Sequence, residues 1–130
     1  PESLGEELRS ACSRVVSAMT KFPELIGGSD RLDTMLMQAA GGRIISKVGA
    51  EGVWLCGILP GDGFEVGGAI ALKIEDGDDR RGRPVVAVAL LKELGLIAAD
   101  SLPELSPMPI RNRRGDTVGR VEAAEIGGIK

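Results

Sequence analysis

The stretch "RIISKVGAEGVWLCGIL", residues 43–59, contains two short apolar segments on either side of a glycine-containing turn. Isoleucine, valine and tryptophan are enriched in β-strands, and glycines between two such segments are typical of a hairpin. The stretch therefore predicts two antiparallel strands. It also places Lys47 beside Gly49, where a backbone without a side chain can be approached closely by a ligand or another chain.

The residues after this hairpin extend the sheet and supply a helix. The segment "GGAIALKI", residues 67–74, predicts a third strand, and three strands joined by short links favour an antiparallel meander. Their almost continuous apolar character predicts that both faces of the sheet are covered. Residues 85–96 then predict a buried helix that begins near Pro84 and ends near Gly95.

Two helices are expected before the hairpin. Residues 6–21 carry apolar side chains at intervals of three and four, and a shorter apolar face follows Gly28. Ser29 and Asp30 offer an N-cap to the second helix, with Asp33 placed as in a capping box. The element order predicts a single α+β domain over residues 1–130, with an antiparallel sheet flanked by helices. Residues 101–130 form a less regular tail that contains a candidate β-hairpin.

Composition limits the classes of function. The 130 residues carry a net charge of −3, which gives no strong positive field for nucleic acid. There is no histidine, so this chain cannot supply an imidazole as base or metal ligand. Cys12 and Cys56 both lie in apolar patterns, which predicts small core residues in a reducing cytoplasm. No apolar stretch is long enough to span a membrane, so neither nucleic acid nor membrane is an expected partner.

Three charged clusters are candidates for chemistry, and each has a simpler structural explanation. Lys47 near accessible backbone can hold a carboxylate or polarise a carbonyl, or it can merely end a strand before an ordinary turn. Residues 73–80, which include Asp76 and Arg80, can bind or brace a substrate, or form a solvated turn. Residues 27–34 can bind an anion at a helix N-terminus, or they can simply end one helix and begin the next.

Four ordered segments of the chain carry a resemblance to a known family. They are "AMTKFPELIGGSDRLDTMLM" (18–37), "GGRIISKVGAEGVWLCGIL" (41–59), "ALKIEDGDDRRGRPVVAVALLKELG" (71–95) and "RNRRGDTVGRV" (111–121). Together they resemble the C-terminal half of the asparaginase II family, the thermolabile, rhizobial-type L-asparaginases. That family is related in fold to serine β-lactamases, penicillin-binding proteins and serine-dependent glutaminases. The resemblance therefore implies the C-terminal part of a β-lactamase/glutaminase-like fold.

The resemblance also implies an activity and a set of site residues. The complete enzyme would hydrolyse L-asparagine to aspartate and ammonia, with a serine nucleophile activated by a lysine. Lys47 stands where the fold relatives carry a Lys-x-Gly motif on an active-site strand, so it is the expected catalytic cation of this chain. The residues expected to shape the pocket or bind substrate are Gly49, Glu51, Asp33, Asp76 and Arg80.

The family's Ser-x-x-Lys nucleophile motif and its zinc motifs of Cys and Lys are not found in this sequence. We therefore expect a C-terminal fragment, inactive alone, whose partners are an amide substrate, the N-terminal half of the enzyme and a second copy in a homodimer. No metal ligand is expected in this chain, and zinc would belong to the full-length enzyme. The alternatives are a non-catalytic α+β module that dimerises or binds a partner, and a glutaminase-type serine hydrolase, which the segment at residues 73–80 disfavours.

Overall fold

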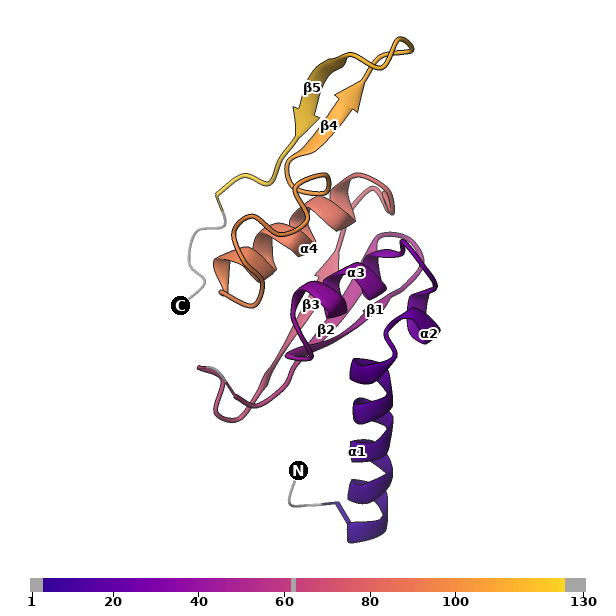
Figure 1. The fold of residues 1–130 in the computed structure, drawn as a ribbon, viewed down its shortest axis with the longest axis vertical. Helices are drawn as coiled ribbons and strands as arrows, with labels where there is room; N and C mark the ends of the chain where they lie inside the picture. Colours follow the sequence, from indigo (N-terminus) through magenta and orange to yellow (C-terminus); the bar gives the residue numbers. More distant parts are fainter. Residues whose placement is uncertain (1–3, 62, 126–130) are drawn as a thin grey trace.

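The computed structural model describes residues 4–61 and 63–125 and confirms an α+β fold whose antiparallel sheet is flanked by helices (Figure 1). No helix in these ranges is long and apolar enough to cross a lipid bilayer. The helices are α1 (Glu6–Lys21), α2 (Glu24–Gly27), α3 (Leu32–Ala39) and α4 (Gly82–Glu93). The strands are β1 (Ile44–Val48), β2 (Val53–Ile58), β3 (Gly68–Lys73), β4 (Met108–Arg111) and β5 (Thr117–Val121).

The central sheet is the expected meander, with strand order β1-β2-β3 and antiparallel pairing throughout. The turn between β1 and β2 is closed by a hydrogen bond from Gly49 N to Val53 O at 2.9 Å. Gly52 in this turn has a φ of 74°, and a Cβ there would lie only 2.8 Å from Ile74 Cβ. Both conditions require glycine. The β4–β5 hairpin forms a separate two-stranded sheet that projects from the body of the molecule (Figure 1).

The core lies on one face of the central sheet. Alternate residues of β1 and β2 point into it, and Trp54 is fully buried at its centre. The opposite face is open in the described part of the chain, where Leu55 of β2 is 54% exposed. The expectation that both faces are covered is therefore wrong for these residues, because α3 and α4 pack into the same core. Its main members are Leu36, Met37, Ile44, Trp54, Cys56, Ile58, Ala87, Val88 and Leu91.

Helix α1 has the bounds that the apolar spacing predicts, yet none of its residues is buried. Leu8 and Val15 are 54% and 58% exposed, and Phe22 just beyond the helix is 51% exposed. Cys12 on this helix is also exposed, whereas Cys56 is 2% exposed. The prediction of two core cysteines is therefore right for Cys56 and wrong for Cys12. An amphipathic pattern identifies an apolar face, but it does not say whether another element covers that face.

We expect the two cysteines to differ in their reactivity toward a thiol reagent such as Ellman's reagent. Burial raises the pKa of the Cys56 thiol to about 12, and the thiolate is the reactive species. In native protein at mildly alkaline pH only Cys12 should react quickly, while denaturing guanidinium should expose both thiols. The Cys12→Ser variant should show no fast thiol in native buffer. Rapid reaction of Cys56 in folded protein would contradict this packing.

Candidate functional site

An open hollow of about 490 Å³ lies where the start of α3, the end of β1 and the start of α4 meet. These segments are far apart in the sequence, and the fold brings their charged residues together. The charged lining comes from Asp30, Arg31, Asp33, Lys47, Asp79, Arg80 and Arg83. A concave surface that gathers charged groups of both signs is a candidate site for a small polar ligand.

Asp33 is the most deeply buried charged residue of the hollow, at 1% exposure. Its Oδ1 accepts a hydrogen bond from Ser46 Oγ at 2.7 Å, and its Oδ2 accepts one from Val48 N at 3.0 Å. Backbone N–H groups alternate in direction along a strand. Since Gly49 N donates to β2, the N–H of Val48 faces the opposite, outer edge of β1. Asp33 therefore caps the open edge of the sheet.

This use of Asp33 explains why the capping-box prediction is wrong. Helix α3 begins at Leu32, and Arg31 at the N-cap position makes no side-chain capping bond. The carboxylate of Asp33 bonds to β1 instead of turning back toward the start of its own helix. Thr34 bonds to the preceding segment, with its Oγ1 donating to Gly28 O at 2.7 Å. Tertiary partners have thus displaced the local capping arrangement.

A second buried hydrogen bond extends the network from Asp33 into the core. Trp54 Nε1 donates to Ser46 Oγ at 2.8 Å, and Ser46 is 1% exposed. The Ser46 hydroxyl accepts from the indole and donates to Asp33, so its partners are complementary. Sequence reasoning missed this role of Ser46 and Trp54. The sequence did offer a signal for it. Ser46 is a single hydroxyl residue in an apolar strand, and a buried Trp54 indole N–H in the next strand needs a hydrogen-bond acceptor.

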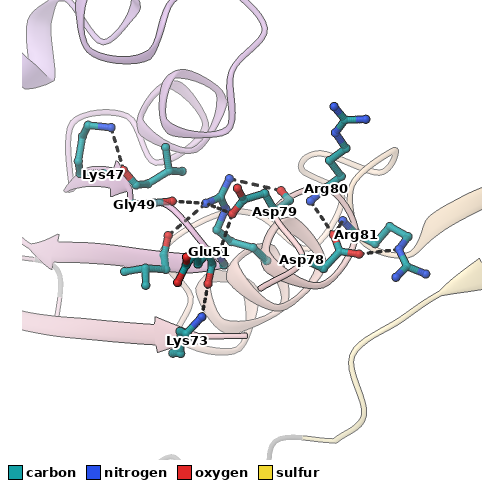
Figure 2. Close-up of polar contacts among 12 residues, drawn as sticks. Lys47, Gly49, Glu51, Lys73, Asp78, Asp79, Arg80 and Arg81 are labelled. Atoms are coloured by element: carbon teal, nitrogen blue, oxygen red, sulfur yellow. Dashed lines mark hydrogen bonds and ion pairs between the residues drawn. The ribbon is translucent and has the colours of Figure 1, made fainter. Parts of the chain in front are cut away.

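Lys47 lies at the rim of the hollow. Its Nζ donates to a carbonyl oxygen next to it in the chain, Val48 O, at 2.9 Å (Figure 2). The same Nζ is 3.5 Å from Asp33 Oδ2. The Lys47 side chain is 57% exposed, so the ammonium can be reached from solvent. Its partner Asp33 is 1% exposed, so this ion pair is open to solvent only on the lysine side. Asp33 keeps its hydrogen bonds from Ser46 and Val48 without Lys47, so the ion pair is better suited to placing a cation than to holding the fold together.

Arg83, the second residue of α4, ties the β1–β2 turn to the start of that helix. Its Nη1 lies 2.7 Å from both Gly49 O and Asp79 Oδ1, and its side chain is 9% exposed. Asp79 Oδ1 also accepts a hydrogen bond from Gly52 N at 2.8 Å. Arg83 and Asp79 thus fix the turn that follows Lys47. Neither residue was singled out from the sequence, because their partners are in a distant turn.

Arg80 is a further charged residue that lines the hollow. Its backbone N–H, like that of Arg81, donates to Asp78 Oδ1 at 2.7 Å. The backbone N–H bonds from Arg81 and Arg80, together with the Arg81 side chain, lower the pKa of Asp78 to about 2. The Arg80 side chain extends away from Asp79 and Arg81 (Figure 2). No carboxylate within residues 4–61 and 63–125 pairs with it.

Of the residues expected at the site, Lys47, Asp33 and Arg80 come together at the hollow. Gly49, Glu51 and Asp76 do not line it. A Cβ at Gly49 would meet Val53 Cβ at 3.1 Å, so the missing side chain serves packing within the hairpin.

Glu51 and Asp76 take part in local structure near the hollow. Glu51 has a φ of 56°, and its carbonyl accepts a hydrogen bond from Lys73 Nζ. Asp76 Oδ1 accepts a hydrogen bond from Asp78 N at 2.9 Å, in the turn before α4. Glu51 therefore shapes the β1–β2 turn, and Asp76 shapes the loop before α4 that packs against Gly52.

The comparison with known families gives one match. The family described as L-asparaginase II matches residues 2–123 of the chain, which include every element and every lining residue of the hollow. No curated protein matches the chain. The family match confirms the resemblance seen in the four sequence segments.

Removing the Asp33 carboxylate should destabilise the fold. Asp33→Ala would leave the Ser46 hydroxyl and the Val48 N–H without their acceptor, at a cost of about 2–4 kcal/mol. Urea unfolding followed by circular dichroism measures this change. The exposed Asp76 supplies a matched control, since Asp76→Ala should change the free energy of unfolding by no more than about 0.5 kcal/mol. Equal effects of the two substitutions would contradict the assigned network.

Proposed function

The chain belongs to the L-asparaginase II family, and from this premise we propose that it forms one wall of a site that hydrolyses L-asparagine to L-aspartate and ammonia. Membership supports an asparaginase-like amidohydrolase function at the level of the family. The observation that carries the finer proposal is the position of Lys47 Nζ, accessible at the rim of a charged hollow and 3.5 Å from Asp33 Oδ2.

The charges of the hollow suit an amino acid that carries a side-chain amide. L-Asparagine has an α-carboxylate, an α-ammonium group and an uncharged amide. Arg31 and Arg80 offer guanidinium groups for a carboxylate, and Asp30 offers an acceptor for an ammonium group. Within the described residues none of these three side chains is engaged in an ion pair. Lys47 is then left to interact with the amide oxygen.

In the proposed reaction a serine oxygen attacks the amide carbon, and its proton passes to a lysine amine that acts as base. The C–N bond breaks, ammonia leaves with a proton, and water hydrolyses the resulting ester to aspartate. The positive charge of Lys47 would stabilise the negative charge that develops on the amide oxygen. None of the 130 residues stands in a Ser-x-x-Lys motif, so we propose that a segment outside this chain supplies the nucleophile.

Zinc does not enter these steps. Among residues 4–61 and 63–125, no three His, Cys, Asp or Glu side chains are grouped so that they could hold a metal ion. Cys12 is exposed on α1 and Cys56 is buried in β2, so the two thiols cannot act together as ligands. The resemblance places the zinc motifs of Cys and Lys outside this chain, so zinc in the full-length enzyme stays a prediction.

We propose a cytoplasmic location on chemical grounds alone. Cys12 and Cys56 are both free thiols, and free thiols persist in a reducing compartment. The exposed Cys12 would be open to oxidation elsewhere.

The Lys47→Ala substitution tests the proposed function. In the protein as its gene encodes it, turnover of L-asparagine should fall by about two to three orders of magnitude, the usual effect of removing one preorganised charge. Thermal unfolding should remain near wild type, because Asp33 keeps its hydrogen bonds from Ser46 and Val48. Lys73→Ala is the matched control, since Lys73 lies on β3 outside the hollow. Ammonia release measures turnover, and a panel with L-glutamine separates a glutaminase from an asparaginase.

Two outcomes would contradict the proposal. Wild-type turnover by Lys47→Ala would remove this lysine from the site. Measurable ammonia release by the purified 130-residue chain would show that it needs no nucleophile from outside.

A second candidate function, a module that pairs with another copy of itself, is favoured by the exposed apolar face of α1. Leu8, Val15 and Phe22 recur every seven residues, and each is about half exposed. Glu6 and Glu7 lie in the first turn of α1 and Lys21 in the last. An antiparallel pair of α1 helices would place these opposite charges together and cover the apolar face.

The Val15→Glu substitution tests this pairing. A charge at the centre of the paired face should convert a dimer to a monomer, because its burial would be unfavourable. Sedimentation equilibrium over a dilution series measures the association. Val66→Glu is the matched control, since Val66 is 94% exposed and far from α1 in sequence. A wild-type chain that stays monomeric at high concentration would contradict self-association.

A further inference from the structure

The two carboxylate oxygens of Asp33 have partners of different kinds. Oδ1 faces the core and accepts from Ser46 Oγ at 2.7 Å. Oδ2 faces the site, where it accepts from Val48 N at 3.0 Å and lies 3.5 Å from Lys47 Nζ. Asp33 itself is 1% exposed, and both of its oxygens are already engaged. A carboxylate in this state is poorly placed to bind a substrate, which is the role first expected for it.

We infer that Asp33 is a positioning residue, which holds the Lys47 ammonium at the rim of the hollow while the Ser46–Trp54 pair fixes the carboxylate from the core side. The catalytic meaning of this role rests on the proposed function of Lys47. Ser46 and Trp54 have no access to the hollow, and they act only by immobilising Asp33.

The immobility of Asp33 is what makes such positioning effective. Lysine is a flexible side chain, and an exposed ion pair restrains it only weakly when the partner also moves. Here Asp33 is the second residue of α3 and is hydrogen-bonded to Ser46, which accepts from the fully buried Trp54 at 2.8 Å. The position of the carboxylate is therefore set by the packing of the core.

Oδ2 also fixes the backbone beside the lysine. The same oxygen that lies near Lys47 Nζ accepts the hydrogen bond from Val48 N, the next residue in the chain. Lys47 Nζ in turn donates to Val48 O at 2.9 Å. The Lys47 ammonium, the Val48 backbone and the Asp33 carboxylate thus each contact the other two. Lys47 Nζ is thus held between two oxygen atoms, Val48 O at 2.9 Å and Asp33 Oδ2 at 3.5 Å.

Competitive acylation of the 130-residue chain tests the inference without substrate. Trace acetic anhydride labels lysine amines, and mass spectrometry gives the rate at Lys47 relative to the exposed Lys21 of α1. Asp33→Asn removes the charge that holds the ammonium, so the Lys47/Lys21 ratio should rise at least threefold. Ser46→Ala keeps the Oδ2 contacts but removes the bond that fixes the carboxylate, so its ratio should rise less than that of Asp33→Asn.

The two variants separate positioning from a merely structural role. An unchanged ratio in Asp33→Asn, or an equal rise in both variants, would overturn the inference. Circular dichroism must show that each variant is folded. If Asp33→Asn does not fold, the test moves to the partner: Lys47→Met should shift the ¹³C resonance of the Asp33 side-chain carboxyl group, whereas Lys73→Met should not. An unshifted Asp33 signal would then overturn it.

These experiments can refute the positioning role of Asp33 and the proposed asparaginase activity separately. If the acylation ratio responds to Asp33→Asn while Lys47→Ala retains full asparaginase turnover, the positioning contact stands and the assigned activity falls. If turnover depends on Lys47 but the ratio is unchanged in Asp33→Asn, the activity stands and Asp33 is not its positioning residue.

Discussion

The site depends on one buried carboxylate placed under the open edge of a sheet. An unpaired charge at the burial of Asp33 would cost several kcal/mol, so its partners must be present whenever the chain is folded. Those partners are the Ser46 hydroxyl and the outer N–H of Val48, and the Lys47 ammonium adds an ion pair at the rim of the hollow. Satisfying one charge therefore joins α3, the end of β1 and the core through Trp54.

A second buried charge of opposite sign holds the same strand end from the other side. Arg83 donates to Gly49 O and pairs with Asp79, which also accepts from Gly52 N. The turn between Lys47 and Gly52 is thus fixed by a carboxylate before it and a guanidinium after it. This support explains how the turn tolerates a positive φ at Glu51, a conformation that costs a non-glycine residue roughly 1–3 kcal/mol. Because Lys47 directly precedes this turn, a rigid turn also fixes the backbone of Lys47.

Local patterns predicted the elements of this fold but not the contacts between them. Short apolar segments at β1 and β2, apolar spacing in α1 and an apolar segment between Pro84 and Gly95 at α4 gave element positions that the structure confirms to within a few residues. The roles of Asp33 and Arg83 could not be found this way, because Asp33 bonds across 13 residues to Ser46 and Arg83 across 34 to Gly49. Local periodicity carries no information at such separations. The wrong capping-box prediction shows the same limit. Asp33 lies three residues after Asp30, as a capping box requires, but the outer edge of β1 competes for its carboxylate.

The balance of charge in the hollow links this architecture to the proposed reaction. Asp33 and Asp79 are committed to Lys47 and Arg83, which leaves Asp30 with Arg31 and Arg80 and one positive charge in excess. Asparagine is neutral overall as a zwitterion, whereas attack on its amide adds a negative charge at the oxygen. An excess positive charge therefore binds the transition state more strongly than the substrate, which is the condition for catalysis. A fixed Lys47 strengthens this preference, because a preorganised cation need not reorient as the charge develops.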